Sequence, residues 1–364
     1  MKRSLLVDTH ANSCYFRTSV SGDGRKALVQ ITERCNLHCA HCFVSSTRVG
    51  NDMALDAITS VVLPRLRAAR VERVTLTGGE PFVHPDIMEI CRTVTDTGMS
   101  LGICTNATQA SDEQIAHLAE LGVHVNVSFD GFRPESHGKF RGNQASFATT
   151  LATTTKFAEA GLLQGLLSTP NALTDPEEFA DLCEFASEVG AKYVLMNPLS
   201  SFGRGIKSKG RLAADAAKMD AIRAVTRRFA DRVELVDIRF PNGDKPLGGC
   251  DAGKLIYVFT DGQLAVCPYL VFAARNPISR YPDTDFLAGN ILDHDVEKPL
   301  DGYDFHTRFR VGDNPTCTSC VMENSCGKGC PAAVVANGGR IGDIDTEQCP
   351  VAPEGVRLLP VSLA

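Results

Sequence analysis

Directly after the apolar run at 27–32, the chain reads Cys35-Asn36-Leu37-His38-Cys39-Ala40-His41-Cys42. That run has the length and composition of a buried strand, so the three cysteines follow the carboxyl end of a strand. Three thiolates on one loop can hold three irons of a 4Fe-4S cluster and leave the fourth iron open. The alternative is zinc with His38 or His41 as fourth ligand, although structural zinc loops usually begin with the shorter C-x2-C spacing.

The region around this loop repeats a short apolar run followed by an amphipathic stretch, which is typical of βα units and a parallel sheet. Strands are predicted at 27–32, 71–77, 100–105, 123–129, 162–168 and 193–197. Helices are predicted at 54–69, 85–97, 111–121, 146–160, 175–189 and 212–231. Six units predict an α/β fold, a partial (β/α)6 barrel, and such barrels place their chemistry at the carboxyl ends of the strands.

The composition changes from residue 250 onward, where Gly, Asp, Pro and Cys increase and only short strands are readable, at 255–260 and 263–266. We therefore expect a small, irregular, cysteine-rich domain after the barrel. The expected divisions are an N-terminal extension at 1–26, the barrel at 27–234, a linker at 235–249, the cysteine-rich domain at 250–350 and a C-terminal tail at 351–364.

The chain of 364 residues contains 14 Cys and no Trp, and its 37 Lys+Arg and 43 Asp+Glu give a net charge of −6. Mild acidity favours neither nucleic acid nor an anionic membrane as a partner. No apolar run approaches the roughly 18 residues that span a bilayer, and the N-terminal apolar run is too short for a signal peptide. We therefore expect a cytoplasmic protein, in which clustered cysteines bind metal rather than form disulfides.

The C-x3-C-x2-C spacing after the first strand resembles the signature of radical S-adenosylmethionine (SAM) enzymes. The resemblance implies that Cys35, Cys39 and Cys42 hold a 4Fe-4S cluster whose open iron binds SAM. An electron from a donor such as flavodoxin or ferredoxin would cleave SAM to a 5′-deoxyadenosyl radical, which abstracts hydrogen from the substrate. His41 stands where the family usually has an aromatic residue near adenine, and its ring could stack similarly.

Two further motifs end predicted strands and strengthen this resemblance. Thr77-Gly78-Gly79-Glu80-Pro81 matches the family's GGE motif, which assigns Gly78, Gly79 and Glu80 to the amino group of SAM. Val127-Ser128-Phe129-Asp130-Gly131, with His137 and Arg141-Gly142 after it, resembles a stretch of the peptide-modifying members, which assigns Ser128 and Arg141 to the cofactor. Taken alone, each motif is also compatible with an ordinary capped turn.

Two further cofactor contacts rest on position alone. Asn106 ends the third strand, where the family commonly has Asn-Gly, but here Ala107 follows it. Met196 ends the sixth strand, where the backbone of relatives often meets adenine, although a methionine there is more often part of the core.

The C-terminal cysteines form the pattern C-x11-G-x4-C, a gap, C-x2-C-x5-C-x3-C, a gap and C. They are Cys250, Cys267, Cys317, Cys320, Cys326, Cys330 and Cys349. Half of this set could form a zinc knuckle. The whole set resembles the SPASM extension of radical SAM enzymes, which binds two auxiliary 4Fe-4S clusters and brings the expected total to three.

The SPASM resemblance assigns these cysteines to an outer and an inner cluster. The outer cluster would take Cys317, Cys320, Cys326 and Cys349. The inner cluster would take Cys250, Cys267 and Cys330. No further cysteine lies between Cys183 and Cys267 except Cys250. We therefore expect the fourth iron of the inner cluster to be open to solvent, substrate or another side chain.

Four cysteines remain, and small core residues are the default interpretation of Cys14, Cys91, Cys104 and Cys183. Cys14 and Cys104 are also candidates for the thiol that donates hydrogen in some radical epimerases. The stretch 203–211 is the main basic loop, which we interpret as a solvated face or, less commonly, a substrate entrance.

These features support a peptide-modifying enzyme that forms a carbon–carbon or thioether crosslink in a ribosomally made precursor. The roughly 25 residues before the first strand are too few for a leader-binding domain, so a separate leader-binding protein is expected. One alternative is a radical dehydrogenase or epimerase of a small molecule such as an aminocyclitol or sugar. Another is a zinc-binding adaptor without catalysis. No catalytic residue is identified from the sequence.

Overall fold

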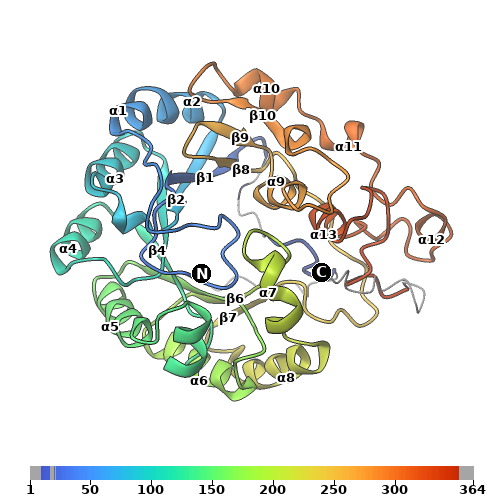
Figure 1. Cartoon of the computed structure of the whole chain (residues 1–364), viewed down its shortest axis with the longest axis horizontal. Helices are drawn as coiled ribbons and strands as arrows, with labels where there is room; N and C mark the ends of the chain where they lie inside the picture. The colour runs from blue at the N-terminus through green and yellow to red at the C-terminus, as the bar shows by residue number, and fades with distance from the viewer. Residues whose placement is uncertain (1–9, 17–19, 21, 352–364) are drawn as a thin grey trace.

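The computed structural model describes residues 10–16, 20 and 22–351 of the chain, and its centre is a ten-stranded sheet (Figure 1). The strand order is β10-β9-β8-β1-β2-β3-β4-β5-β6-β7. The strands are β1 (Arg25–Thr32), β2 (Val71–Gly78), β3 (Ser100–Thr105), β4 (His124–Ser128), β5 (Leu163–Ser168), β6 (Tyr193–Met196), β7 (Glu234–Asp237), β8 (Leu255–Val258), β9 (Gln263–Ala265) and β10 (Leu287–Asn290).

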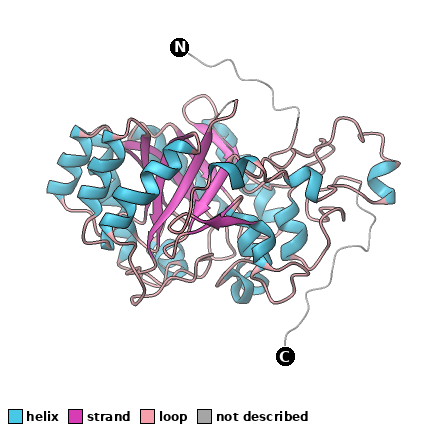
Figure 2. Ribbon diagram, turned by 90° about the horizontal axis from the view of Figure 1, so that it is seen from above, coloured by secondary structure: helices cyan, strands magenta, loops and turns pink. Residues whose placement is uncertain are grey.

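Helices and short helical turns cover the outside of this sheet (Figure 2). In the first half of the chain they are α1 (Leu55–Ala57), η1 (Ile58–Val62), α2 (Leu63–Ala68), η2 (Pro81–Val83), α3 (Ile87–Asp96), α4 (Asp112–Glu120), η3 (Pro134–Gly138), α5 (Ser146–Glu159) and α6 (Pro176–Glu188). In the second half they are α7 (Gly205–Leu212), α8 (Ala216–Thr226), η4 (Arg227–Phe229), α9 (Pro268–Ala274), η5 (Asp283–Phe286), α10 (Glu297–Asp301), α11 (Phe305–Arg308), α12 (Pro315–Thr318) and α13 (Pro331–Ala336).

The predicted α/β fold with a largely parallel sheet is confirmed. Strands β1 to β7 pair in chain order and run parallel. The six predicted strands agree with β1 to β6 to within two residues at either end. The reason is that strands of a parallel sheet are covered on both faces, so they read as short apolar runs. Seven of the eight residues of β1 are accordingly buried.

Strand β10 and the helices α9 to α13 of the cysteine-rich part were not predicted, and two elements before residue 250 also differ from the prediction. A seventh parallel strand, β7, follows the sixth βα unit and ends inside the stretch expected to be a linker. Its four residues contain only two apolar side chains, Leu235 and Val236, too few for a readable run. The stretch expected to be a basic loop contains the helix α7, whose buried residues are Gly205 and Ser208, so it packs without a buried apolar stripe.

The cysteine-rich part of the chain joins the same sheet. Strand β8 pairs parallel with β1 on the side opposite β2, and β9 and β10 continue the sheet in antiparallel order. The buried cluster of apolar residues runs without a break from β1 to Val335 in α13. Strand β1 therefore lies where the barrel strands and the C-terminal strands meet.

None of the helices in the described ranges is long and apolar enough to cross a membrane.

The inner face of the sheet carries a polar contact that depends on one glycine. Tyr193 in β6 extends across β5 and donates a hydrogen bond from its Oη to Asn126 Oδ1 in β4, at 2.5 Å. Gly165, which pairs with Tyr193, lies beneath the ring, and a Cβ at that position would overlap the ring carbons. Only glycine allows Tyr193 to reach Asn126 in this way.

We predict that Gly165→Ala lowers the free energy of unfolding by about 1–3 kcal/mol, because the added methyl group overpacks the site and displaces Tyr193. The measurement is urea denaturation of the anaerobically purified protein. Gly210→Ala is the matched control, because a Cβ there meets no atom within 4 Å and alanine favours the helix α7. Equal unfolding midpoints for the two variants would contradict the packing argument.

Candidate active site

The loop after β1 brings Cys35, Cys39 and Cys42 together around Leu37 in a small buried cluster of their own. Burial raises the pKa of Cys35 to about 11 and the pKa of Cys39 to about 12. Thiolates at these positions therefore need a nearby positive centre, and a metal supplies one. Three thiols on one buried loop are the type of donor that an iron–sulfur cluster takes.

Backbone hydrogen bonds from several segments hold this cysteine loop. Cys35 N donates to Thr47 O at 2.6 Å, and Ala40 N donates to Phe140 O at 2.8 Å. Leu37 N lies 3.5 Å from Cys35 Sγ, in the position of an N–H···S hydrogen bond. Contacts of this kind to cluster sulfurs are one of the means by which a protein sets a reduction potential.

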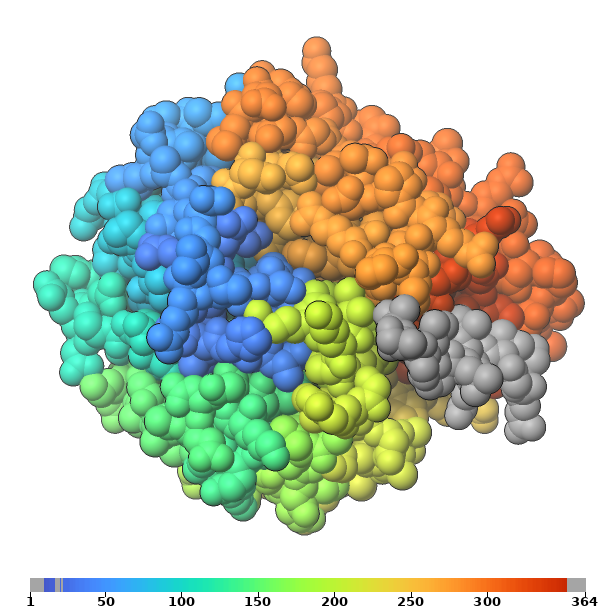
Figure 3. All heavy atoms as spheres, viewed as in Figure 1, coloured from blue at the N-terminus to red at the C-terminus, as the bar shows by residue number. Residues whose placement is uncertain are grey.

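Arg204, just before α7, holds the loop from the other side. Its Nε donates to Cys39 O at 2.8 Å and its Nη1 donates to Ser46 O at 2.6 Å. Ser208 Oγ donates to Ala40 O at 2.7 Å. The space-filling view shows this segment, in yellow-green, against the blue N-terminal part of the chain at the centre of the face (Figure 3). The basic stretch thus includes a clamp on the cysteine loop, which no local sequence signal indicated.

The Gly78-Gly79-Glu80 turn packs directly on the start of the cysteine loop. Gly79 N donates to Thr32 O and Glu80 N donates to Arg34 O, both at 2.9 Å. A Cβ at Gly79 would overlap the Arg34 carbonyl oxygen, so the two chain segments approach closely because the position is glycine.

Glu80 itself is buried and has protein donors. Its Oε1 accepts a hydrogen bond from Thr105 Oγ1 at 2.6 Å, and its Oε2 accepts one from Asn106 N at 2.8 Å. Burial raises the pKa of Glu80, against the effect of these hydrogen bonds. The carboxyl group is therefore locked in place at the ends of β2 and β3, and its contact with SAM remains a prediction.

The ends of β4 and the cysteine loop meet in a buried ion pair. Arg141 Nη2 lies 2.8 Å from Asp130 Oδ2, and both side chains are at most 5% exposed. Burial alone raises the pKa of Asp130, but the Arg141 charge and the neighbouring histidines hold it below its ordinary value. His41 Nε2 lies 3.6 Å from the same carboxylate, and the His41 ring stacks on Phe140 with centroids 4.8 Å apart. The sequence motif contained Asp130, but its pairing with Arg141 and His41 was not predicted.

The remaining residues that were predicted to contact the cofactor differ in where their side chains lie. Asn106 lies close to the loop and donates from Nδ2 to Asn36 Oδ1 at 3.0 Å. Ser128 is half-buried at the end of β4. Met196 is fully buried in the core, and its carbonyl accepts a hydrogen bond from Ile238 N. The structure therefore brings Asn106 and Ser128 to the carboxyl edge of the sheet but keeps the Met196 side chain away from it.

Buried polar atoms without a partner provide a test of whether a polar cofactor fits here. Five such atoms belong to residues at or near the ends of β1 and β4 to β6. They are His41 Nδ1, His137 Nε2, Arg141 Nε, Ser168 Oγ and Asn197 Oδ1. An unsatisfied buried polar group costs about 1–3 kcal/mol. A ligand rich in donors and acceptors, as SAM is, fits this edge of the sheet.

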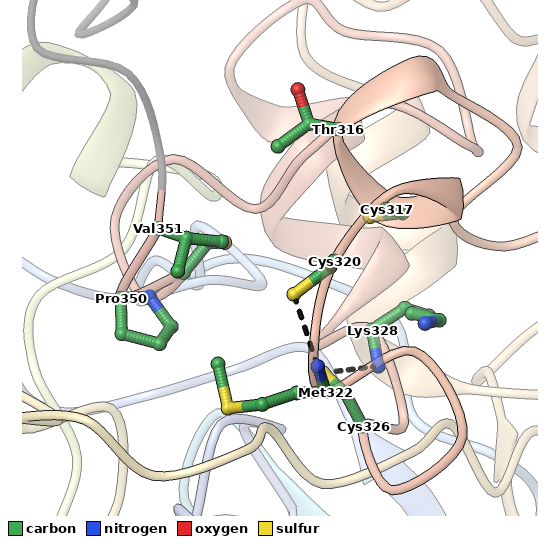
Figure 4. Close-up of a pocket in the computed structure, with 9 residues that line it drawn as sticks. Thr316, Cys317, Cys320, Met322, Cys326, Lys328, Pro350 and Val351 are labelled. Carbon is green, nitrogen blue, oxygen red and sulfur yellow. Dashed lines mark hydrogen bonds between the residues drawn. The ribbon is translucent and has the colours of Figure 1, made fainter.

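Four of the C-terminal cysteines share one cavity, which is shown in Figure 4. Cys317, Cys320, Cys326 and Cys349 line it, together with Met322 and Lys328 among others. Backbone N–H groups of Met322 and Lys328 point at Cys320 Sγ and Cys326 Sγ, each at 3.4 Å (Figure 4). This is the set that the sequence assigned to the outer cluster.

The other three C-terminal cysteines, the predicted inner set, also lie near one another. Cys267 and Cys330 immediately precede α9 and α13, two helices that pack together. Burial first, and then the charges of Cys267 and Cys330, raise the pKa of Cys250. Within the described residues, no group of three or more His, Cys, Asp or Glu side chains is arranged so that it could hold a metal ion. The ligand roles of all these cysteines therefore remain predictions.

A parallel sheet whose first strand is followed by a three-cysteine loop, with a Gly-Gly-Glu turn beside it, agrees with the expectation of a radical SAM domain. Residues 29–186 match the family model of the radical SAM superfamily, so this part of the chain is a radical SAM domain. The family implies SAM and a 4Fe-4S cluster as cofactors.

Curated relatives resemble the chain over different lengths. It is 27% identical to mycofactocin maturase MftC of Mycobacterium ulcerans, over 84% of this chain and 82% of that protein. It is 33% identical to an AdoMet-dependent heme synthase of Methanosarcina barkeri, over 51% of this chain and 54% of that protein. The matches span only 54–59% of the length of the first three curated relatives.

Solved structures share the fold. Streptococcus suis SuiB bound to precursor peptide SuiA has a TM-score of 0.65 and 17% identity, over 86% of this chain and 73% of that chain.

We predict that His137 makes stability depend on pH. Burial, followed by the Arg141 charge, lowers the pKa of His137 to about 3, against about 6.5 when unfolded. As the pH falls, His137 is therefore protonated in the unfolded state before it is protonated in the folded state. The free energy of unfolding decreases as the pH falls from about 6.5 toward 3. Between pH 6.5 and 5 the loss is about 2 kcal/mol, measured by urea denaturation at each pH.

His137→Asn keeps an acceptor for Asp130 N, which His137 Nδ1 now provides at 3.3 Å, but it does not titrate. We expect this variant to show a smaller loss over the same pH range. The exposed His117→Asn is the control and should retain the full loss. A full loss in His137→Asn would show that other groups cause the pH dependence.

Proposed function

We propose that the chain is a radical SAM enzyme that oxidatively modifies a ribosomally made peptide by forming a carbon–carbon or thioether crosslink. The observation that carries the proposal is the convergence at one edge of the sheet. There the buried cysteine loop, the Gly-Gly-Glu turn and the Asp130–Arg141 pair meet, next to buried polar atoms that lack partners. The two groups of C-terminal cysteines support auxiliary clusters of the SPASM type.

In this proposal, Cys35, Cys39 and Cys42 hold a 4Fe-4S cluster, which with SAM supplies the hydrogen-abstracting radical. Arg204 and the backbone partners of the loop orient the three cysteines. Asp130 holds Arg141 by an ion pair and leaves Arg141 Nε free for the cofactor. His41, stacked on Phe140, closes the site on the side of the loop and excludes water from it.

Three further residues complete the proposed SAM contacts. Glu80 and Asn106, which are hydrogen-bonded to each other, face the amino-acid part, and the half-buried Ser128 faces the ribose and carboxylate. The backbone of Gly78 and Gly79 lies beside them. Met196 would contribute only through its backbone, because its side chain belongs to the core.

Peptide modification is favoured by the relatives that cover most of the chain. MftC is a maturase, and SuiB has been solved with a precursor peptide. We propose the same substrate class here, with a separate leader-binding protein and a flavodoxin or ferredoxin as electron donor. The auxiliary clusters would accept the electron that remains when the crosslink forms.

A second candidate, oxidation or epimerisation of a small molecule such as an aminocyclitol or sugar, has one observation in its favour. The heme synthase, at 33% identity, is named for a product that is not a peptide. The match to the heme synthase covers about half of this chain. It therefore supports a shared radical chemistry more than it supports a small-molecule substrate.

We predict that Cys39→Ala abolishes dithionite-dependent formation of 5′-deoxyadenosine and removes about four of about twelve irons after anaerobic reconstitution. Cys183→Ala is the matched control, because this thiol is fully buried in α6. We expect Cys183→Ala to retain the iron content and the reaction. Stoichiometric zinc without SAM cleavage in the unaltered protein would instead support a zinc-binding adaptor.

The substrate class is tested with short peptides encoded beside the gene, presented with any leader-binding protein encoded there. A crosslink removes two hydrogens from the peptide, and tandem mass spectrometry locates the loss. We expect this loss only with SAM and reductant. An unchanged peptide, together with SAM-dependent turnover of a sugar or aminocyclitol, would favour the small-molecule alternative.

A further inference from the structure

A fourth thiol joins the predicted inner set of cysteines. Cys14 Sγ lies 3.0 Å from Gly249 O and 3.9 Å from Gly329 O, the carbonyl oxygens of the residues that directly precede Cys250 and Cys330. Cys250 and Cys330 in turn interact with Cys267. These four cysteines come from three distant parts of the chain, and the tertiary structure places them in one buried region.

The segment that carries Cys14 is held in place by a buried arginine. Arg239 Nη1 donates to Ser13 O at 2.8 Å, and Arg239 N donates to Asn12 O at 2.7 Å. The Arg239 side chain is 1% exposed and is paired with Asp345, which also accepts a hydrogen bond from Cys330 N at 3.2 Å. The same ion pair therefore positions both Cys14 and Cys330.

Aromatic and backbone contacts fix the segment further. Tyr15 stacks on Tyr269, which follows Cys267 by two residues, with ring centroids 4.9 Å apart. Ala11 N donates to Pro246 O at 2.9 Å, and Gly248 N donates to Ala11 O at 3.1 Å. The segment is therefore anchored on both sides of Cys14, next to the chain that leads to Cys250.

Glycines allow the segments to approach closely. Cys14 Sγ donates to Gly249 O at 3.0 Å, one residue before Cys250. A Cβ at Gly327 would overlap the backbone of Gly249, and Gly329 N donates to Gly248 O at 3.1 Å. Cys330 follows directly, so the backbone of both neighbouring segments converges on the Cys14 thiol.

We propose that Cys14 is the fourth protein ligand of the inner auxiliary cluster. This inference rests on the proposed function, because it requires that Cys250, Cys267 and Cys330 hold a cluster. Four thiolates would occupy all four irons, so neither solvent nor substrate binds this cluster. The inner cluster then carries electrons and does not bind substrate, and Cys14 is not a hydrogen donor to the substrate.

The other spare cysteines do not reach this place. Cys91 and Cys183 lie in α3 and α6, and Cys104 lies in β3. Each is therefore a suitable control for the loss of a thiol as such. Cys183 is preferred because its side chain is fully buried in α6.

The experiment uses the full chain, reconstituted anaerobically, in a background in which Cys35, Cys39 and Cys42 are all alanine. Only the auxiliary clusters remain in this background. Iron and sulfide are counted, and the electron paramagnetic resonance spectrum of the reduced protein is recorded with and without added 2-mercaptoethanol. With Cys14 present, we expect about eight irons and a spectrum that the added thiol does not change.

Adding Cys14→Ala opens one iron. We expect either the loss of about one to four irons, or a retained cluster whose spectrum shifts on addition of 2-mercaptoethanol. Cys14→Ser should retain the iron and change the spectrum without added thiol, because an oxygen ligand replaces sulfur. Cys183→Ala should match the background in every measurement.

Two results would overturn the inference. One is a spectrum of the background protein that shifts with 2-mercaptoethanol, since the fourth iron would then be open. The other is a Cys14→Ala protein with full iron content and an unshifted spectrum. Failure of the proposed function is recognised separately: the background protein would bind no iron at all, or Cys250→Ala would leave the iron content unchanged.

Discussion

The pairing of β1 with β2 on one side and β8 on the other is the constraint on which the rest of the structure depends. It places the carboxyl end of β1 where the barrel strands meet the strands of the cysteine-rich part. The cysteine loop emerges there. It donates hydrogen bonds to the carbonyl oxygens of Thr47 and Phe140 and accepts one from the Arg204 side chain. Parallel strands end at a common edge of the sheet. The residues that follow β2, β3 and β4 therefore lie at the same edge as the cysteine loop.

Burial of charge is the second organising feature. Two of the buried arginines are each paired with a buried aspartate: Arg141 with Asp130, and Arg239 with Asp345. A buried pair is expensive to break because the remaining charge is left uncompensated. Each pair lies beside one proposed cluster site, and each fixes backbone as well as charge. Arg239 also adopts a left-handed backbone conformation with φ of 50°. Its contacts with Asp345 and Ser13 hold the residue in this conformation.

Most of the sheet could be predicted from the sequence because each strand from β1 to β6 is a short apolar run, and amphipathic helices separate most of these runs. The short strands β7 and β10 and the helix α7 could not be predicted, and α7 packs through Gly205 and Ser208 rather than through an apolar stripe. The motif residues could be predicted, but their partners could not. Arg204 was interpreted as part of a solvated loop, yet it binds the carbonyl groups of the cysteine loop.

The sequence by itself determined the class of chemistry, because ligand types and their spacing along one loop are local properties that a fold cannot alter. The SPASM resemblance also predicted a division of the C-terminal cysteines into two sets. Only the tertiary structure decided that Asp130 faces Arg141, that Arg204 binds the Cys39 carbonyl, and that the Cys14 thiol meets the carbonyls of Gly249 and Gly329. These contacts join residues that are far apart in the chain. They form only when the whole sheet has packed, so a local sequence pattern cannot predict them.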